Sequence, residues 1–287
     1  MHIWTHLKPS SQGVTGLGIY PDGMVEHDGQ VGELLTKLDE LGIADNTIVM
    51  YSTDNGAEAM SWPDGGTTIF RGEKNTNWEG GYRVPCFIRW PGVIKPGTII
   101  NDIASHEDMF PTVLAAAGDT TAKEDRLKGR RVGDTTFKVH IDGYNLLPAF
   151  KGGVEWPRHE FLYWTNDGNV AALRYNQWKV TFLRQDAHSL HVWTEPFVEL
   201  RAPLIANLRS DPLERGEYEG IDYGRWRRKS DSCNRNQWRC DGAARAWSCR
   251  PRQVHRGGCT GRPHPIKCSP AHLWPALDLR EPDRHPD

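Results

Sequence analysis

The chain has 287 residues, of which 38% are hydrophobic and 10% aromatic, and its formal net charge is -2. This apolar content is enough for a sizeable core, and a charge near zero excludes bulk attraction to nucleic acid or to an anionic membrane surface. No stretch approaches the roughly 20 apolar residues of a membrane span, and residues 1–6 lack the charged and apolar regions of a signal peptide. We therefore expect neither nucleic acid nor membrane among the partners.

Residues 22–41 predict an amphipathic helix, because apolar side chains recur at helical spacing and Gly42 follows as a stop signal. These apolar side chains are Val25, Val31, Leu34, Leu35, Leu38 and Leu41. The β-branched and apolar residues 47–53 then predict a strand. A helix leading into a strand is an αβ unit, so we expect it to add a parallel strand to a doubly wound sheet, and the predicted class is α/β.

The next part of the chain alternates between loops and short elements. Residues 65–81 are rich in Gly, Asn and Thr without a period, which predicts a long ordered loop. Residues 84–90 predict a strand that resumes the sheet, and residues 106–117 predict a helix. Residues 119–136 are polar and charged, so we expect them to form a surface excursion.

After Tyr144 the pattern changes to short alternating or aromatic-rich runs between residues 158 and 208. Turn signals separate these runs, at Asn166-Asp167-Gly168 and at Tyr175-Asn176-Gln177. This pattern predicts a small antiparallel sheet.

From about Gly224 the composition changes again. Residues 225–287 carry 14 Lys and Arg against 6 Asp and Glu, have no apolar period, and hold five of the six cysteines. This predicts a disordered tail, and so abrupt a change is what translation in a wrong reading frame would give. The cysteines show no Cys-x-x-Cys spacing, which disfavours zinc, and no nucleic-acid-binding module is recognisable. We expect three parts: residues 1–143, 144–223 and 224–287.

The strongest motif is the end of the strand at residues 47–53. It stops at Asp54-Asn55-Gly56, and open α/β sheets place their sites at the carboxyl ends of strands. Carboxylate and carboxamide oxygens are hard ligands that suit calcium or magnesium. Lys74 and Arg83 follow and add positive charge, a combination that suits a tetrahedral oxyanion.

These residues resemble the type I sulfatases, specifically the arylsulfatase branch of the alkaline phosphatase-like superfamily. The resemblance is carried by Asp54-Asn55-Gly56, Gly72-Glu73-Lys74, Glu79-Gly80-Gly81-Tyr82-Arg83-Val84-Pro85, Arg89-Trp90-Pro91-Gly92, Ser105-His106-Glu107-Asp108-Met109-Phe110-Pro111-Thr112 and Asn207-Leu208-Arg209-Ser210-Asp211-Pro212. It covers roughly residues 1–220. It implies an alkaline phosphatase-like doubly wound sheet, truncated at the amino end, with a small C-terminal antiparallel sheet.

The resemblance implies a calcium-dependent hydrolase acting on a small-molecule sulfate ester. Asp54 and Asn55 match the family's calcium ligands, and Lys74 matches a lysine that contacts the sulfate. One histidine of the family contacts the sulfate ester or protonates its leaving oxygen, and the alignment favours His6 for this substrate-binding and catalytic role, with His2 as the second choice.

Several neighbouring residues are expected to have structural roles. We expect Glu79 and Arg83 to form an ion pair that braces the loop, and His106 and Asp108 to cap or pack a helix rather than bind metal. Cys86, in an apolar strand, is expected to be a buried small hydrophobe.

The family's nucleophile is a formylglycine made from a Cys/Ser-x-Pro/Ala-x-Arg motif, and the sequence contains no such motif. The run from Cys268 to His272 comes close but has His in place of Arg and follows the calcium loop instead of preceding it. We therefore expect a fragment that is inactive alone. The alternatives are a non-catalytic remnant and a phosphatase or phosphodiesterase of the same superfamily. Relatives are often periplasmic or secreted, and the sequence leaves the compartment undetermined.

Overall fold

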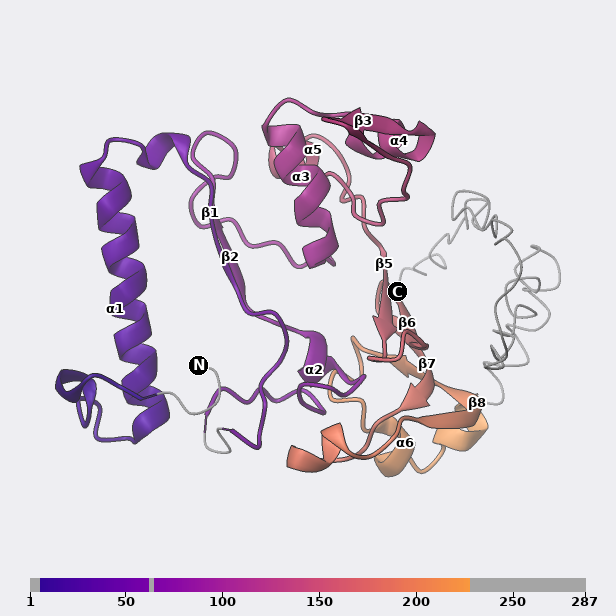
Figure 1. The fold of residues 1–287 in the computed structure, drawn as a ribbon. Helices are drawn as coiled ribbons and strands as arrows, with labels where there is room; N and C mark the ends of the chain where they lie inside the picture. The colour runs from indigo at the N-terminus through magenta and orange to yellow at the C-terminus, as the bar shows by residue number, and fades with distance from the viewer. Residues whose placement is uncertain (1–5, 62–64, 228–287) are drawn as a thin grey trace, which may run out of the picture. The chain divides into compact units, whose positions relative to one another are not determined.

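The computed structural model describes residues 6–61 and 65–227 (Figure 1). The chain up to Glu219 forms one compact unit, and every element described below lies within it. His2 and residues 228–287 lie outside the described residues, so the disordered tail stays a prediction, as does the boundary between residues 143 and 144. No helix within the described ranges has the length and apolar content to cross a membrane.

One helix is long and the others are short. The α-helices are α1 (Ile19–Glu40), α2 (Glu79–Tyr82), α3 (Met109–Ala116), α4 (Ala122–Lys128), α5 (Leu147–Phe150) and α6 (Gly216–Glu219). Single 3-10 turns are η1 (Pro9–Ser11), η2 (Ala44–Asn46), η3 (His106–Asp108) and η4 (Ser189–Trp193).

Helix α1 confirms the helix predicted for residues 22–41 and begins three residues earlier. The earlier start is possible because Pro21 lies in the first turn, where its missing N–H costs no helical bond. Asp22 fixes this turn by accepting hydrogen bonds from the backbone N–H groups of Gly13 and Thr15, at 2.6 and 2.9 Å. The helix ends before Gly42, whose φ of 65° is the left-handed conformation that glycine adopts at low cost.

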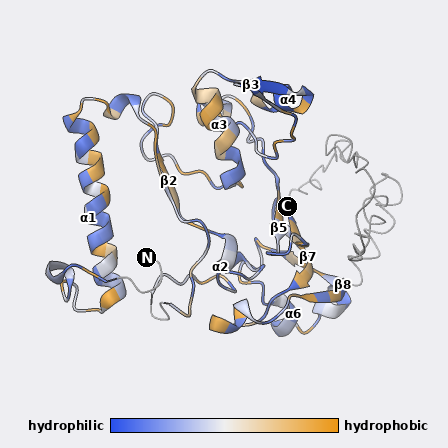
Figure 2. Cartoon of the chain, viewed as in Figure 1, coloured by the Kyte–Doolittle hydropathy of each residue, from blue (hydrophilic) through white to orange (hydrophobic). Residues whose placement is uncertain are grey.

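Apolar and polar positions recur along α1 (Figure 2), but the described residues cover only part of the apolar stripe. Val31, Leu35 and Leu38 are half-buried. Val25 and Leu34 are 54% and 68% exposed. The periodicity therefore predicted the helix correctly without showing how much of it would be covered.

Strands β1 (Val49–Ser52) and β2 (Cys86–Arg89) confirm the two strands predicted for residues 47–53 and 84–90. They form a two-stranded antiparallel sheet, with Ser52 opposite Cys86. The expected parallel neighbour of β1 is not found among the described residues. The expectation that Cys86 is buried is wrong, because its side chain is exposed where only one strand flanks it.

The small antiparallel sheet expected between residues 158 and 208 is present. Its strands are β5 (Glu160–Trp164), β6 (Val170–Tyr175), β7 (Trp178–Arg184) and β8 (Val198–Asn207), paired in that order. Both predicted turns are in place, with φ of 78° at Gly168 and 49° at Asn176. Tyr163, Ala171 and Ala172 form the buried core of this sheet, so the sheet has its own apolar centre.

The polar surface segment expected at residues 119–136 contains some regular secondary structure. It contains α4 and a hairpin of β3 (Arg130–Val132) and β4 (Thr135–Phe137), and its residues are mainly hydrophilic (Figure 2). Before it, η3 and α3 confirm the helix predicted for residues 106–117.

Three glycines let the loop after β1 pack directly on the loop that carries α2. Gly56 N–H donates to Gly81 O at 2.9 Å, and a Cβ at Gly56 would lie 1.8 Å from Gly80 O. A Cβ at Gly80 or Gly81 would lie within 2.5 Å of backbone carbonyl oxygens. Only glycine permits this backbone-to-backbone contact.

We predict that Gly56→Ala lowers the free energy of unfolding by about 1–3 kcal/mol or more, because the added methyl group meets backbone that cannot rotate away. The measurement is urea unfolding followed by circular dichroism. Gly29→Ala is the control, since Gly29 lies in α1 with open space around its Cα, and it should gain about 0.5–1 kcal/mol of helix propensity. Equal unfolding midpoints for the two variants would contradict this packing.

Candidate functional site

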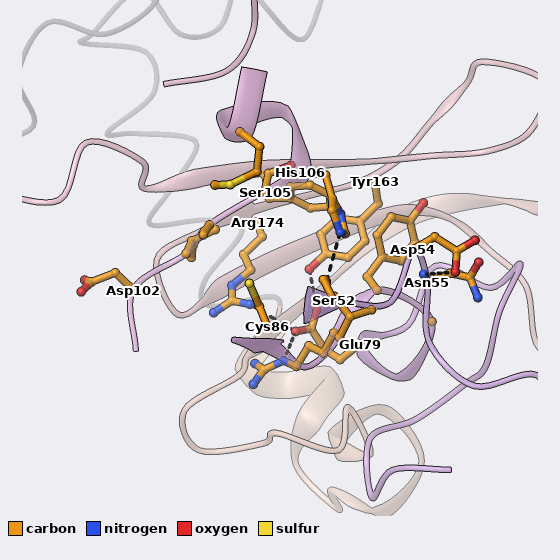
Figure 3. Close-up of a pocket in the computed structure, with 18 of the residues that line it drawn as sticks. Ser52, Asp54, Asn55, Glu79, Cys86, Asp102, Ser105, His106, Tyr163 and Arg174 are labelled. Carbon is orange, nitrogen blue, oxygen red and sulfur yellow. Dashed lines mark hydrogen bonds and ion pairs between the residues drawn. The ribbon is translucent and has the colours of Figure 1, made fainter. Parts of the chain in front are cut away.

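The predicted metal and sulfate residues lie on one pocket. It has a volume of about 820 Å³, and Asp54, Asn55 and Lys74 all line it. Figure 3 labels Asp54 and Asn55 among its lining residues. The wall is built from the end of β1, the loop and helix at residues 74–83, strands β2, β5 and β6, and the segment before α3. The sequence predicted these three side chains to act together, and the structure brings them together.

Asp54 and Asn55 follow β1 directly. Asp54 is exposed, and its Oδ1 accepts the Asn55 N–H at 3.0 Å. The Asn55 Nδ2 donates to Gly56 O at 2.8 Å, which turns the carboxamide so that its oxygen stays available. Among the described residues, Asp54 Oδ2 and Asn55 Oδ1 have no hydrogen-bond donor. Both are oxygen donors of the kind that calcium prefers.

The ligand set is incomplete within the part of the chain that the structure describes. No group of three or more His, Cys, Asp or Glu there is placed to hold a metal ion. Asp54 and Asn55 therefore fit calcium in kind but supply two of the roughly 6–8 oxygen ligands that it takes.

Lys74 is held beside this position by its backbone. Its N–H donates to Ala57 O at 2.8 Å, which ties the Lys74 loop to the loop after β1. Its ammonium group lies 3.8 Å from Glu58 Oε1 and 5.6 Å from the ring centroid of Trp193. At that length the contact with Glu58 is loose, so the ammonium group remains able to bind an anion.

The structure places a different histidine on the pocket wall from those favoured by the sequence. His6 is exposed and is not among the lining residues, and His2 lies outside the described residues. His106 does line the pocket, with its Nε2 3.2 Å from the hydroxyl of Ser52 (Figure 3). A structural role was predicted for His106, because nothing local in the sequence indicates that η3 meets the end of β1.

Asp108, two residues after His106, caps the start of this helix, which is the structural role that the sequence predicted. Its Oδ2 accepts the Ser105 N–H at 2.9 Å in a capping box. Arg158 donates to both of its carboxylate oxygens, at 2.8 and 2.7 Å. Asp108 is fully buried, so the prediction that it caps and packs this helix is confirmed.

The expected ion pair of Glu79 and Arg83 is present and belongs to a larger buried cluster. Arg83 Nε lies 2.6 Å from Glu79 Oε2, and Arg174 Nη1 lies 3.2 Å from the same oxygen. Lys179, which is fully buried, lies 3.2 Å from Glu79 Oε1 and 2.8 Å from Glu214 Oε1. Tyr163 also donates its hydroxyl to Glu79, at 2.5 Å. The sequence predicted one ion pair. The structure shows a buried cluster of charged and polar side chains that joins α2 to strands β5, β6 and β7.

The titration behaviour of the cluster follows from these contacts. Burial alone would raise the pKa of Glu79, but Lys179, Tyr163, Arg83 and Arg174 together lower that pKa to about 2. Burial raises the pKa of Glu214, which Lys179 only partly offsets. Burial and the Glu79 carboxylate raise the pKa of Tyr163 well above its usual value, so its hydroxyl remains a donor.

Comparison with known proteins relates the chain to one family. The family model described as Sulfatase matches residues 16–119. The chain is 32% identical to the steryl-sulfatase of Mus musculus over 97% of this chain and 44% of that protein. It is 28% identical to the arylsulfatase A of Homo sapiens, over 90% of this chain and 52% of that protein. The chain thus spans about half of the length of these curated relatives.

The fold agrees with a solved structure. The PsFucS1 sulfatase from Pseudoalteromonas sp. superposes with a TM-score of 0.62 and 26% identity, over 82% of this chain and 47% of that chain. The small antiparallel sheet and the mixed α/β unit are therefore those of the sulfatase fold with its alkaline phosphatase-like architecture.

We predict that Glu79→Gln lowers the free energy of unfolding by about 3 kcal/mol at pH 7, because it leaves Lys179 and two arginines short of a carboxylate. The folded pKa of Glu79 is lowered, so ionised Glu79 stabilises the fold above its ordinary value of 4.5, and this contribution is lost as the pH falls toward about 2. The difference between wild type and variant should therefore shrink over that window. The pKa of Glu214 is raised by burial and in part by the Glu79 carboxylate, so Glu214 is present in both proteins but its pKa is raised less in the variant.

Urea unfolding at pH 7, 4.5, 3 and 2 measures this difference. Glu40→Gln is the control, since its pair with Lys37 is exposed and should contribute under about 0.5 kcal/mol at any pH. A difference between wild type and Glu79→Gln that is independent of pH would show that packing rather than charge explains the loss.

Proposed function

This chain belongs to the type I sulfatase family, and we propose that its pocket is the calcium- and sulfate-binding part of a sulfate ester hydrolase. The observation that carries the proposal is that Asp54, Asn55 and Lys74 line one pocket. Their loops are fixed to each other through backbone hydrogen bonds, from Gly56 to Gly81 and from Lys74 to Ala57. A site fixed by backbone keeps its donors in place without reorganisation.

Asp54 and Asn55 would hold the calcium ion through Asp54 Oδ2 and Asn55 Oδ1, the two oxygens that no described donor occupies. When bound, calcium supplies positive charge that attracts a sulfate group to this end of the pocket. Lys74 would donate to a sulfate oxygen and offset the charge that develops there as the ester bond breaks. Its loose contact with Glu58 at 3.8 Å leaves its ammonium group able to do so.

Protonation of the leaving oxygen is assigned to a histidine. His6 remains the first choice from the family resemblance and His2 the second. The structure adds His106, which lines the pocket beside Ser52 at the end of β1. Its imidazole is exposed, so it is free to exchange protons with solvent or ligand.

The substrate is proposed as a small-molecule sulfate ester. The curated relatives named above are a steryl-sulfatase and an arylsulfatase, and the pocket wall includes aromatic side chains that suit an apolar alcohol. These are Phe150, Trp156, Phe161, Tyr163, Trp164, Trp193 and Phe197.

We predict that the chain binds calcium no more tightly than the micromolar range, because Asp54 and Asn55 supply few of the ligands that the ion takes. Titration calorimetry should show that Asp54→Asn weakens binding at least several-fold. Asp102→Asn, which removes an exposed carboxylate from the same pocket wall, should leave it unchanged. Sub-micromolar affinity, or equal losses in the two variants, would place the calcium ligands elsewhere.

We also predict that the 287-residue chain hydrolyses 4-nitrophenyl sulfate no faster than a heat-denatured control in calcium buffer. The sequence contains no Cys/Ser-x-Pro/Ala-x-Arg motif, and loss of a covalent nucleophile costs orders of magnitude in rate. Release of 4-nitrophenol is followed by absorbance. Turnover that Asp54→Asn abolishes would show that the chain supplies a nucleophile of its own.

A further inference from the structure

Two arginines from distant parts of the sequence converge on a single carboxylate oxygen in the pocket wall. Arg83 follows α2 and Arg174 lies on β6, and both guanidinium groups contact Glu79 Oε2, at 2.6 and 3.2 Å. The Glu79 side chain is completely buried, whereas those of Arg83 and Arg174 are 36% and 20% exposed. Both arginines line the pocket that contains Asp54 and Lys74, and Figure 3 labels Arg174 and Asp54 in it. Glu79 thus lies behind two guanidinium groups that reach the pocket.

Both arginines keep hydrogen-bond donors that the fold does not use. Arg83 uses Nε for Glu79, and its Cζ lies 4.4 Å from the ring centroid of Phe70. Arg174 uses Nε for Asn176 O and Nη1 for Glu79. Within residues 6–61 and 65–227, no acceptor contacts Nη1 or Nη2 of Arg83 or Nη2 of Arg174. A guanidinium group offers five N–H donors in a planar fork suited to oxyanions, so three nitrogens remain for a ligand.

The charges of the cluster also leave positive charge on the pocket side. Two carboxylates, Glu79 and Glu214, face three cations: Lys179, Arg83 and Arg174. Lys179 contacts both carboxylates from within the fold, where it is fully buried. If the arginines served only to neutralise Glu79, one of them would be superfluous. One cationic charge is thus in excess where the wall meets solvent.

We propose that Arg83 and Arg174 form a second anion subsite in this pocket, which binds a second sulfate or a carboxylate on a ligand whose first sulfate is held by Lys74 and the calcium position. The proposal rests on the proposed function for the first anion only. The second subsite stands on the Arg83 and Arg174 geometry. It implies a ligand carrying two anionic groups, one for each set of donors.

The test compares three probes that cannot be hydrolysed, by titration calorimetry in calcium buffer: benzenesulfonate, benzene-1,3-disulfonate and 3-sulfobenzoate. The wild-type chain should bind at least one of the two dianions about tenfold more tightly than benzenesulfonate, which is a difference of about 1.4 kcal/mol. A gain for the disulfonate alone identifies a second sulfate as the partner of the arginines. A gain for 3-sulfobenzoate as well shows that a carboxylate is also accepted.

Variants separate the two subsites. Arg174→Gln should reduce the preference for the dianion to twofold or less and leave benzenesulfonate affinity within twofold. Arg174→Lys keeps the charge beside Glu79 but loses the free Nη2 donor, so it should retain only part of the preference. Lys74→Gln should weaken all three probes together. Arg131→Gln is the matched control, since this arginine is 73% exposed on the β3–β4 hairpin, and it should change nothing.

Wild-type protein that binds mono- and dianions equally would overturn the subsite, and so would an Arg174→Gln variant that keeps the full preference. If Lys74→Gln has no effect while Arg174→Gln removes the preference, the arginine subsite holds and the proposed sulfate role of Lys74 fails. Melting temperatures of all variants establish that they are folded. Should Arg174→Gln fail to fold, Arg174→Lys decides: a reduced preference supports the proposal, and a preference retained in full without the Nη2 donor would overturn it.

Discussion

A carboxylate without access to water needs compensating charge, and Glu79 obtains it from Lys179, a residue 100 positions further along the chain. Breaking such a pair costs several kcal/mol, although a buried pair adds little net stability compared with apolar packing. Its effect is therefore one of specificity. Glu79 lies on α2, next to the loop that carries Lys74, and Lys179 lies on β7, so the pair fixes where the C-terminal sheet docks against the pocket loop.

Several other contacts reinforce the same junction. Trp78 donates its indole N–H to Gln185 O at 2.7 Å, and Lys179 donates to Asn77 O at 2.8 Å. On the Lys74 side, Asn75 Oδ1 accepts a hydrogen bond from Asn166 at 2.8 Å. Residues 73–79 are thus held at both ends by the β5–β8 sheet and its connections. A loop without regular structure becomes rigid because its polar groups are satisfied by partners far away in the sequence.

The Glu79 cluster links the stability of the fold to the placement of the side chains that are proposed to bind anions. The donors proposed to bind an anion, Lys74 at one position and Arg83 with Arg174 at the other, all belong to the loop or to the sheet that the Glu79 cluster joins. Two such anion positions would select ligands by the spacing of their charges as well as by charge itself. The aromatic side chains on the pocket wall would contact the apolar part of such a ligand.

The sequence alone determined the local elements and suggested the candidate site. Helical periodicity located α1, alternating and aromatic-rich runs predicted the small antiparallel sheet, and Asp54, Asn55 and Lys74 were predicted as site residues because their oxygen and ammonium groups have a recognisable order along the chain. These signals are local or depend on motif spacing. What only the tertiary structure decided depends on contacts between residues far apart in sequence. The antiparallel pairing of β1 with β2, the exposure of Cys86, the meeting of His106 with Ser52 and the convergence of Arg83 and Arg174 on Glu79 are all of this kind. No periodicity or motif records such contacts, because burial and pairing are properties of the packed chain rather than of any one segment.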